Sequence, residues 1–159
     1  MIKPDVVFCY ASDDVLESMI LRAKKRLLIV GPALSERVAN ALLERIKAAD
    51  LEAASGRPRI TVVLDDKAET YRLGYGSAIE QLEPLRKHAD QGSLQFRMEP
   101  GVRIGALVSD DDAVIFSPTP QLVEQPASSV TTRRNGIALH GREVDRLARA
   151  SGWSPPLST

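Results

Sequence analysis

The chain has 159 residues, of which 43% are hydrophobic and 26% charged, and these values predict a single soluble globular domain with a substantial core. Its 21 Lys and Arg residues balance 21 Asp and Glu residues, which argues against a protein that coats nucleic acid, because such proteins usually carry a basic excess. No apolar run approaches the roughly 18 residues that a membrane span needs, and the single cysteine excludes an internal disulfide.

The opening residues bear on the compartment of the protein. The sequence MIKPD lacks the charged and apolar regions of a signal peptide, so we expect a cytoplasmic protein. Cys9 follows in an apolar run, which favours a small buried hydrophobe. A nucleophilic thiol is the alternative, and it would need a histidine or another cation beside it.

The first half of the chain alternates predicted strands and helices. Ser12 and Ser35 each precede an amphipathic stretch, and both are suitable helix N-caps. Two apolar runs joined by the second helix make a β-α-β unit, which predicts parallel strands with a right-handed crossover. The expected elements are a strand at Val6–Tyr10, a helix from Ser12 to about Lys25, a strand at Leu27–Val30, a helix from Ser35 to about Ala54 and a strand at Ile60–Leu64.

The second half adds a hairpin and two further helices. Pro84 lies inside the first of these helices and predicts a kink or a break there. Two β-rich runs joined by an acidic triplet, Asp110 to Asp112, indicate the hairpin. The expected elements are a helix from Ser77 to about Ala89, a strand at Leu94–Met98, hairpin strands at Ile104–Val108 and Ala113–Phe116, a strand at Ile137–Leu139 and a helix at Glu143–Ala150.

Together these elements predict an α/β fold, with a mixed, largely parallel central sheet and helices packed on both faces. We expect one domain over residues 1–159, with a weakly ordered tail from about residue 151.

The sequence has no motif that is typical of nucleotide or metal binding. The segment YRLGYG, Tyr71–Gly76, lacks the spacing of a phosphate-binding loop, and no P-loop or dinucleotide-binding fingerprint follows a strand. His88 and His140 have no second ligand at a metal-binding spacing, so we interpret both as surface residues. We interpret the acidic triplet as a solvated turn instead of a cation site. We therefore predict no cofactor and no metal.

The order of elements from Ser12 to Leu139 resembles one half of the phospholipase D-like superfamily. The mark of that family is H-x-K, four residues, then D, with six more residues leading to G-S-x-x-N. In the family the His is the nucleophile on phosphorus, the Lys and the Asn hold phosphate oxygens, and the Asp lies in the hairpin turn. The resemblance implies a phospholipase D-like α/β fold for this chain.

This sequence keeps the spacing of the motif but not its residues. With the motif's Asp placed on Asp110, Arg103 stands at the His and Gly105 at the Lys. Glycine has no side chain to hold phosphate, and a guanidinium forms no phosphohistidine. We therefore predict a degenerate active site with no catalytic residues. The remaining motif positions hold Ser117 and Pro118 in place of the Gly-Ser pair and Gln121 in place of the Asn.

The resemblance implies a non-catalytic module that acts in dimerisation, scaffolding or ligand sensing. Catalytic members of the family bring two motifs together, within one chain or by dimerisation, and this chain has one half. We therefore expect a homodimer through the strand and loop surface near Arg103. Degenerate domains of this kind resemble those attached to DNA-binding regions in transcription regulators, so the chain could belong to a larger regulatory protein.

Two other functions stay open on the sequence. Arginine suits bidentate phosphate contacts, so the chain could bind a small anionic phosphoryl ligand or act as a phosphodiesterase-type enzyme with a non-standard site. Nucleic-acid binding through the same arginines is the other alternative, which the neutral charge and the 4% aromatic content do not favour. The candidate anion-binding residues are Arg72, Arg97, Arg103, Ser117, Thr119, Arg133 and Arg134.

Overall fold

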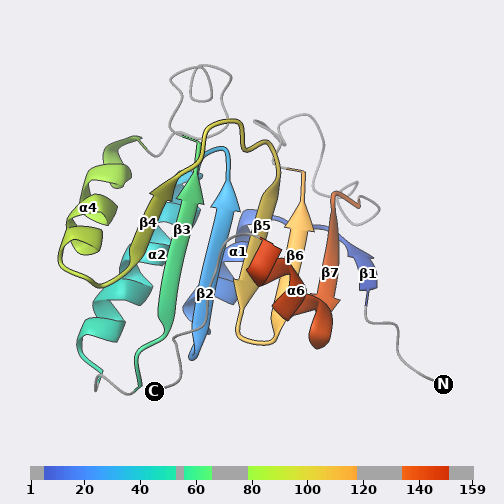
Figure 1. Ribbon diagram of the computed structural model, residues 1–159, viewed down its shortest axis with the longest axis horizontal. Helices are drawn as coiled ribbons and strands as arrows, with labels where there is room; N and C mark the ends of the chain where they lie inside the picture. The colour runs from blue at the N-terminus through green and yellow to red at the C-terminus, as the bar shows by residue number, and fades with distance from the viewer. Residues whose placement is uncertain (1–5, 53–55, 66–78, 118–133, 151–159) are drawn as a thin grey trace.

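The computed structural model describes residues 6–52, 56–65, 79–117 and 134–150. Within these ranges, seven strands form one sheet in the order β1-β7-β6-β5-β2-β3-β4 (Figure 1). Each strand overlaps one that the apolar runs predict. The predicted tail from about residue 151 and the YRLGYG segment lie outside the described residues. The strands are β1 (Val6–Cys9), β2 (Arg26–Gly31), β3 (Arg59–Leu64), β4 (Gln95–Met98), β5 (Gly105–Ser109), β6 (Asp112–Phe116) and β7 (Gly136–His140).

The expectation of a largely parallel sheet is wrong. β2 pairs in parallel with β3, and β3 with β4, whereas the other four pairings are antiparallel. A parallel neighbour needs a crossover of about a dozen or more residues, and residues 99–104 are too few to make one. They join the end of β4 to the start of β5 at the same end of the sheet, across β3 and β2, so β5 runs back antiparallel beside β2. The hairpin to β6 then continues an antiparallel half of the sheet.

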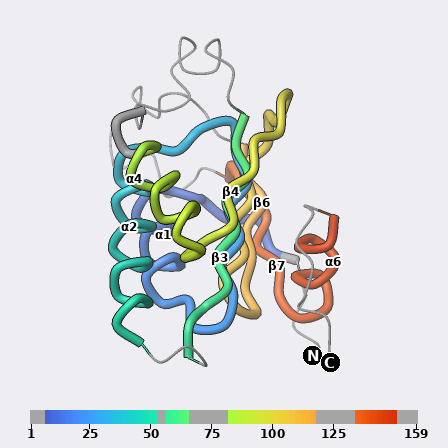
Figure 2. The backbone as a smooth tube through the Cα atoms, turned by 60° about the vertical axis from the view of Figure 1, so that its left-hand side comes forward, coloured from blue at the N-terminus to red at the C-terminus, as the bar shows by residue number. Residues whose placement is uncertain are grey.

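The described helices cover both faces of the sheet (Figure 2). α1 (Asp13–Leu21), α2 (Glu36–Asp50) and α4 (Ile79–Asp90) share a face, and α6 (Arg142–Ala150) lies on the opposite face. The predicted arrangement of helices on both faces is therefore correct. None of these helices combines the length and the apolar character that crossing a membrane requires.

Ser12 and Ser35 cap α1 and α2, as predicted. The hydroxyl oxygen of each accepts a backbone N–H from the residue three positions on, Val15 at 3.3 Å and Val38 at 3.2 Å. Each cap places the first turn of its helix beside the end of a strand. Both helices consequently begin at the same end of the sheet.

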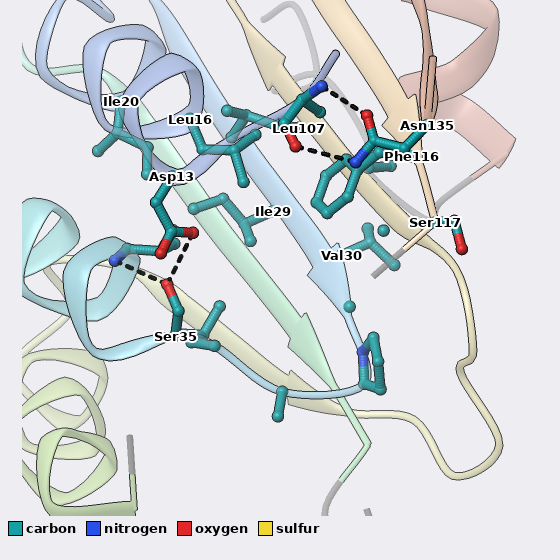
Figure 3. A pocket seen from close by; sticks show the side chains of 18 residues that line it. Asp13, Leu16, Ile20, Ile29, Val30, Ser35, Leu107, Phe116, Ser117 and Asn135 are labelled. Carbon is teal, nitrogen blue, oxygen red and sulfur yellow. Dashed lines mark hydrogen bonds between the residues drawn. The ribbon is translucent and has the colours of Figure 1, made fainter. Parts of the chain in front are cut away.

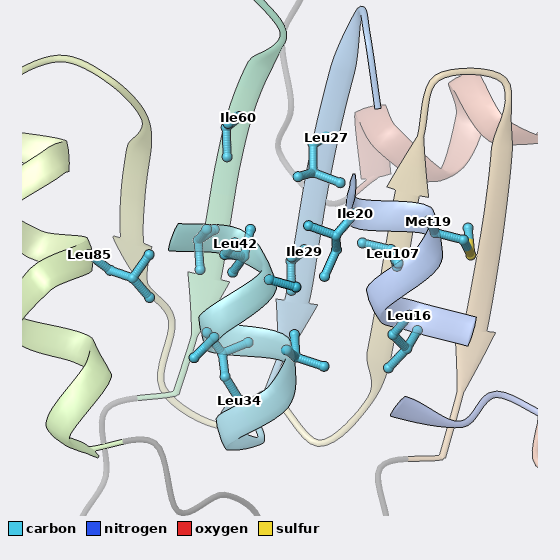
Figure 4. Close-up of a cluster of buried hydrophobic side chains, with 14 of the residues drawn as sticks. Leu16, Met19, Ile20, Leu27, Ile29, Leu34, Leu42, Ile60, Leu85 and Leu107 are labelled. Carbon is cyan, nitrogen blue, oxygen red and sulfur yellow. The ribbon is translucent and has the colours of Figure 1, made fainter. Parts of the chain in front are cut away.

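The larger core lies between the sheet and the three helices on its shared face (Figure 4). Leu42 and Ile46 place α2 over the middle of this core, and both are fully buried. α4 joins the core through Leu82 and Leu85, which flank Pro84. The helix continues through Pro84 without a break, because burial of the two leucines outweighs the backbone hydrogen bond that proline removes.

The smaller core lies under α6. Val144 and Ala148 of this helix are buried against the other face of the sheet, as their spacing predicts. Leu28 of β2 packs in this core, whereas its neighbour Ile29 packs in the larger one. Side chains along a strand alternate between faces, so a central strand that is buried on both faces consists of a continuous apolar run.

The turn between β5 and β6 holds the start of β2 in place. Asp110 has a left-handed backbone conformation, with φ of 55°. Its carboxylate accepts the backbone N–H groups of Lys24, Lys25 and Arg26 at distances from 2.7 to 3.2 Å. The prediction of a simply solvated acidic turn is therefore wrong for Asp110. Its backbone donors come from a segment that is distant in the sequence, so the local pattern of three acids gave no sign of them.

The two histidines have acidic neighbours. His140 is exposed, as predicted, and its Nδ1 lies 2.7 Å from the carboxylate of Asp112. His88 is half-buried, and its Nδ1 lies 3.9 Å from a carboxylate oxygen of Asp50. The prediction of a surface residue is therefore correct for His140 but wrong for His88, whose Nδ1 is buried against the neighbouring structure.

Candidate functional site

One end of the sheet has a hollow on each side. The ends of β2, β3 and β6 meet there with the starts of β5 and β7. The first hollow, which we call the apolar pocket, lies beside α1 and α2 and has a volume of about 100 Å³ (Figure 3). Its lining includes Asp13, Leu16, Ile20, Ile29, Val30, Ser35, Gly105, Leu107, Phe116, Ser117 and Asn135.

The second hollow, which we call the open groove, is wider and has a volume of about 470 Å³. Two of its apolar residues are exposed, Phe8 with 71% of its surface and Ile104 with 52%. Phe116, Ser117 and Asn135 line both hollows. The open groove is lined by Phe8, Arg103, Ile104, Ile115, Phe116, Ser117, Arg134, Asn135, Gly136 and Ile137.

Gly105, at the position of the motif's lysine, lies under an aromatic ring. It pairs with Phe116 across the β5–β6 hairpin. A Cβ atom added at Gly105 would lie 2.5 Å from Cζ and 2.8 Å from Cδ2 of that ring. Carbon atoms normally approach no closer than about 3.5 Å. The Phe116 ring therefore occupies the space into which any side chain at position 105 would project.

Arg103, at the position of the motif's histidine, forms an ion pair with Asp65. Its Nη1 contacts Asp65 Oδ2 and also donates to the carbonyl of Val102 at 2.9 Å. The Asp65 side chain is fully buried and also accepts the backbone N–H of Gly101 at 3.1 Å. This carboxylate offsets the guanidinium charge and weakens its attraction for an external anion. Sequence reasoning missed Asp65, whose one signal was its place directly after a buried strand.

The structure brings together some of the predicted anion-binding residues. Arg103, Ser117 and Arg134 all line the open groove. Arg97 lies on β4, four strands from β6 in the sheet, which separates it from Ser117 by about 19 Å at roughly 4.8 Å per strand. It does not share the groove. The predicted residues Arg72, Thr119 and Arg133 lie outside the described residues, as do the motif positions Pro118 and Gln121.

Asn135 ties the start of α1 to the strands beside the site. Its Oδ1 accepts the backbone N–H of Ala11 at 2.6 Å, and its Nδ2 donates to the Ala11 carbonyl at 3.0 Å. Its own backbone carbonyl accepts the N–H of Ser117 at 2.9 Å. The local sequence around Asn135 gives no sign of these contacts, because Ala11 lies 124 positions away in the chain.

Asp13 is the acidic residue in the lining of the apolar pocket. It is the first residue of α1, and its Oδ1 accepts the hydroxyl of Ser35, the N-cap of α2, at 3.2 Å (Figure 3). The starts of the two helices are thus joined at the pocket. No local pattern marks Asp13 as a pocket residue, because the convergence of the two helices is a tertiary feature.

The described residues offer neither an activated thiol nor a metal-ligand cluster. Cys9 is partly buried against the larger core, and burial raises the pKa of its thiol, although Arg134 acts in the opposite direction. A raised pKa leaves less of the reactive thiolate. In the part of the chain that the structure describes, no group of three or more His, Cys, Asp or Glu residues is arranged to hold a metal ion.

No protein-family model and no curated protein sequence matches the chain. Its fold is similar to that of several solved structures. For Nuc, a phospholipase D family member from Salmonella typhimurium, the TM-score is 0.56 at 11% identity, over 91% of this chain and 88% of Nuc. For the phosphatidylserine synthase of Haemophilus influenzae, the TM-score is 0.51 at 12% identity, over 92% of this chain and 36% of the synthase.

A third similar structure is TrmBL2, an archaeal chromatin protein, with a TM-score of 0.54 at 11% identity over 92% of this chain. This chain spans 48% of the length of TrmBL2. These three likenesses show the fold: a mixed α/β, phospholipase D-like arrangement around a seven-stranded sheet.

Proposed function

We propose that this chain is a non-catalytic phospholipase D-like module in which the cleft of the family has become a ligand-binding pocket. The observation that carries the proposal is the Phe116 ring over Gly105, in the space of the motif's lysine. In the family that lysine holds phosphate oxygens. Arg103 is no substitute, because its guanidinium faces the carboxylate of Asp65.

The direct test is a phosphodiesterase assay with bis(4-nitrophenyl) phosphate, run beside an active phospholipase D family member as a positive control. We expect no release of 4-nitrophenolate above the rate in buffer, because the motif positions hold neither a nucleophilic histidine nor a lysine. Turnover that Arg103→Ala abolishes would contradict the proposal and would instead assign the chain to enzymes with a non-standard site.

A second copy of the chain is the partner that we propose for the open groove. β1 lies at the edge of the described sheet, and Val6–Cys9 holds no charged residue or proline, two of the devices that block edge pairing. Phe8 projects from this strand with 71% of its surface exposed. Two β1 strands related by a two-fold axis can pair antiparallel and bury both Phe8 rings.

Phe8→Ser should therefore convert a dimer into a monomer, as measured by sedimentation velocity over a range of protein concentrations. Leu51→Ser is the matched control, since Leu51 is 90% exposed at the end of α2 and away from the groove. It should leave the sedimentation coefficient unchanged. Circular dichroism would show that both variants keep their fold. A wild-type chain that stays monomeric at high concentration would argue against this partner.

An anionic phosphoryl ligand or a nucleic acid is the second candidate for the same groove. Arg103, Ser117 and Arg134 line it, and TrmBL2 is described as binding DNA. A module of this kind could then serve within a larger regulatory protein. This candidate is favoured if the sedimentation experiment finds a monomer that binds an oligonucleotide, with binding that Arg134→Ala weakens and that falls as salt rises.

A further inference from the structure

The apolar pocket has a charge pattern opposite to that of a phosphate site. Asp13 contributes a carboxylate to its lining, and the described residues of the lining include no lysine, arginine or histidine. A phosphate in this pocket would be held close to a like charge with no cation in the wall to offset it. The pocket of this chain is therefore unsuited to the anionic ligands of the family it resembles.

The two helix N-termini at the pocket do not reverse this pattern. A helix N-terminus attracts anions through its exposed backbone N–H groups, and α1 and α2 both begin here. Their caps, Ser12 and Ser35, already accept backbone N–H groups. The first turns also hold the chain's own carboxylates, Asp13 and Asp14 in α1 and Glu36 in α2. The positive ends of both helices thus already face acidic side chains.

Asp13 keeps an acceptor for a ligand. Its Oδ1 accepts the Ser35 hydroxyl at 3.2 Å, and Ser35 is the one hydrogen-bond partner of this carboxylate among the described residues. Its Oδ2 is left to accept a hydrogen bond from a ligand. The Ser35 hydroxyl in turn accepts the N–H of Val38 at 3.2 Å, so the carboxylate is positioned by a chain of bonds that ends in the backbone of α2.

The remaining wall is largely hydrocarbon. Leu16, Ile29, Leu107 and Phe116 surround the space next to Asp13 (Figure 3). The volume of about 100 Å³ is somewhat below that of the engineered cavity of about 150 Å³ that binds benzene in another protein. This size suits a five-membered ring or a short branched chain. The side-chain amide of Asn135, on the far side of the pocket, is hydrogen-bonded to the backbone of Ala11.

We propose that the apolar pocket binds a small hydrophobic amine. Its ammonium group donates to Asp13, and its hydrocarbon body packs against Leu16, Ile29 and Phe116. This inference rests on the proposed function as a ligand-binding module and names the ligand class of that pocket. It follows from the combination of one acceptor carboxylate, an apolar wall and a lining that, in residues 6–52, 56–65, 79–117 and 134–150, contains no cation.

The test uses three probes of one shape: cyclopentylamine, cyclopentanol and cyclopentanecarboxylate. Their dissociation constants are measured with the intact chain by titration of its amide NMR signals. We expect the amine to bind at least about 10-fold more tightly than the alcohol, because only the ammonium adds a positive charge that attracts the carboxylate. The carboxylate should show no saturable binding. The shifted signals should include those of Asp13 and Leu107.

Two variants distinguish direct binding by the Asp13 carboxylate from a general effect of negative charge near the pocket. Asp13→Asn should weaken binding of the amine about 10- to 100-fold and leave binding of the alcohol unchanged, which also shows that the pocket is intact. Asp14→Asn is the matched control. It removes the same charge from the same helical turn, but Asp14 pairs with Arg37 and does not line the pocket. It should leave the affinity for the amine unchanged.

Three outcomes would overturn the inference. They are equal binding of amine and alcohol, tighter binding of the carboxylate than of the amine, and an equal loss in Asp13→Asn and Asp14→Asn. Saturable binding of the alcohol or the carboxylate that equals or exceeds binding of the amine would leave the proposed ligand-binding function standing while removing the amine as its ligand. The non-catalytic proposal is tested separately, because turnover in the phosphodiesterase assay would contradict it whatever the probes do.

Discussion

Gly105→Ala lowers the free energy of unfolding by about 2–3 kcal/mol, the cost of forcing an extra carbon into a packed space. The new Cβ would lie 2.5 Å from Cζ of Phe116, so either the ring or strand β5 must move. Gly105→Lys, which restores the residue of the family motif, should be at least as destabilising. Urea denaturation followed by circular dichroism measures both effects.

A double-mutant cycle assigns this cost to the ring. Phe116→Ala makes room for the new Cβ, so Gly105→Ala should cost less than about 1 kcal/mol in the Phe116→Ala background, and the two changes should be clearly non-additive. Gly56→Ala is the control, because a Cβ there meets only the end of the Glu52 side chain at 3.9 Å. Additive effects would mean that the ring does not exclude side chains from position 105. The main support for the non-catalytic proposal would then be removed.

Asp110→Ala should lower the free energy of unfolding by about 3 kcal/mol. The change removes the acceptor for three backbone N–H groups, those of Lys24, Lys25 and Arg26. It also places alanine at a φ of 55°, a conformation that costs roughly 1–2 kcal/mol for such a residue. Asp111→Ala is the matched control in the same turn, where the side chain is exposed, and it should change stability by less than about 0.5 kcal/mol.

The same carboxylate predicts a pH dependence. Burial alone would raise the pKa of Asp110, but the backbone hydrogen bonds from Lys25, Lys24 and Arg26 outweigh it and hold the pKa below its ordinary 3.8. A folded-state pKa below the unfolded value adds stability that is complete above about pH 4 and is lost as pH falls through the folded pKa. The difference in stability between wild type and Asp110→Asn should therefore shrink between about pH 5 and pH 2. A constant difference over that range would show that the ionised carboxylate contributes nothing.

Local signals were enough to predict the elements. Ser12 and Ser35 cap their helices because a hydroxyl can reach an N–H three residues away, whatever the rest of the fold does. The apolar runs mark the strands because a strand buried on both faces needs apolar side chains at every position. Local signals could not predict whether neighbouring strands pair in parallel or antiparallel. The apolar runs of β5 and β6 are compatible with either direction.

The candidate site divides in the same way. The spacing of the motif located Arg103 and Gly105, because a hairpin holds its residues in a fixed register. The partners that determine what these positions can do lie far away in the chain. Asp65 is 38 positions from Arg103 and Ala11 is 124 positions from Asn135. Pairs at such separations leave no local pattern.

The amino-acid sequence by itself determined the helices, the strands, the helix caps and the departure of Arg103 and Gly105 from the motif, because each depends on residues within a few positions of one another. Only the tertiary structure decided that the sheet is mainly antiparallel and that the Phe116 ring occupies the space above Gly105. It likewise decided that Asp110 holds the start of β2 and that Asp13 faces an apolar pocket. These features arise where distant segments pack together, and packing depends on the shapes and charges that meet in space.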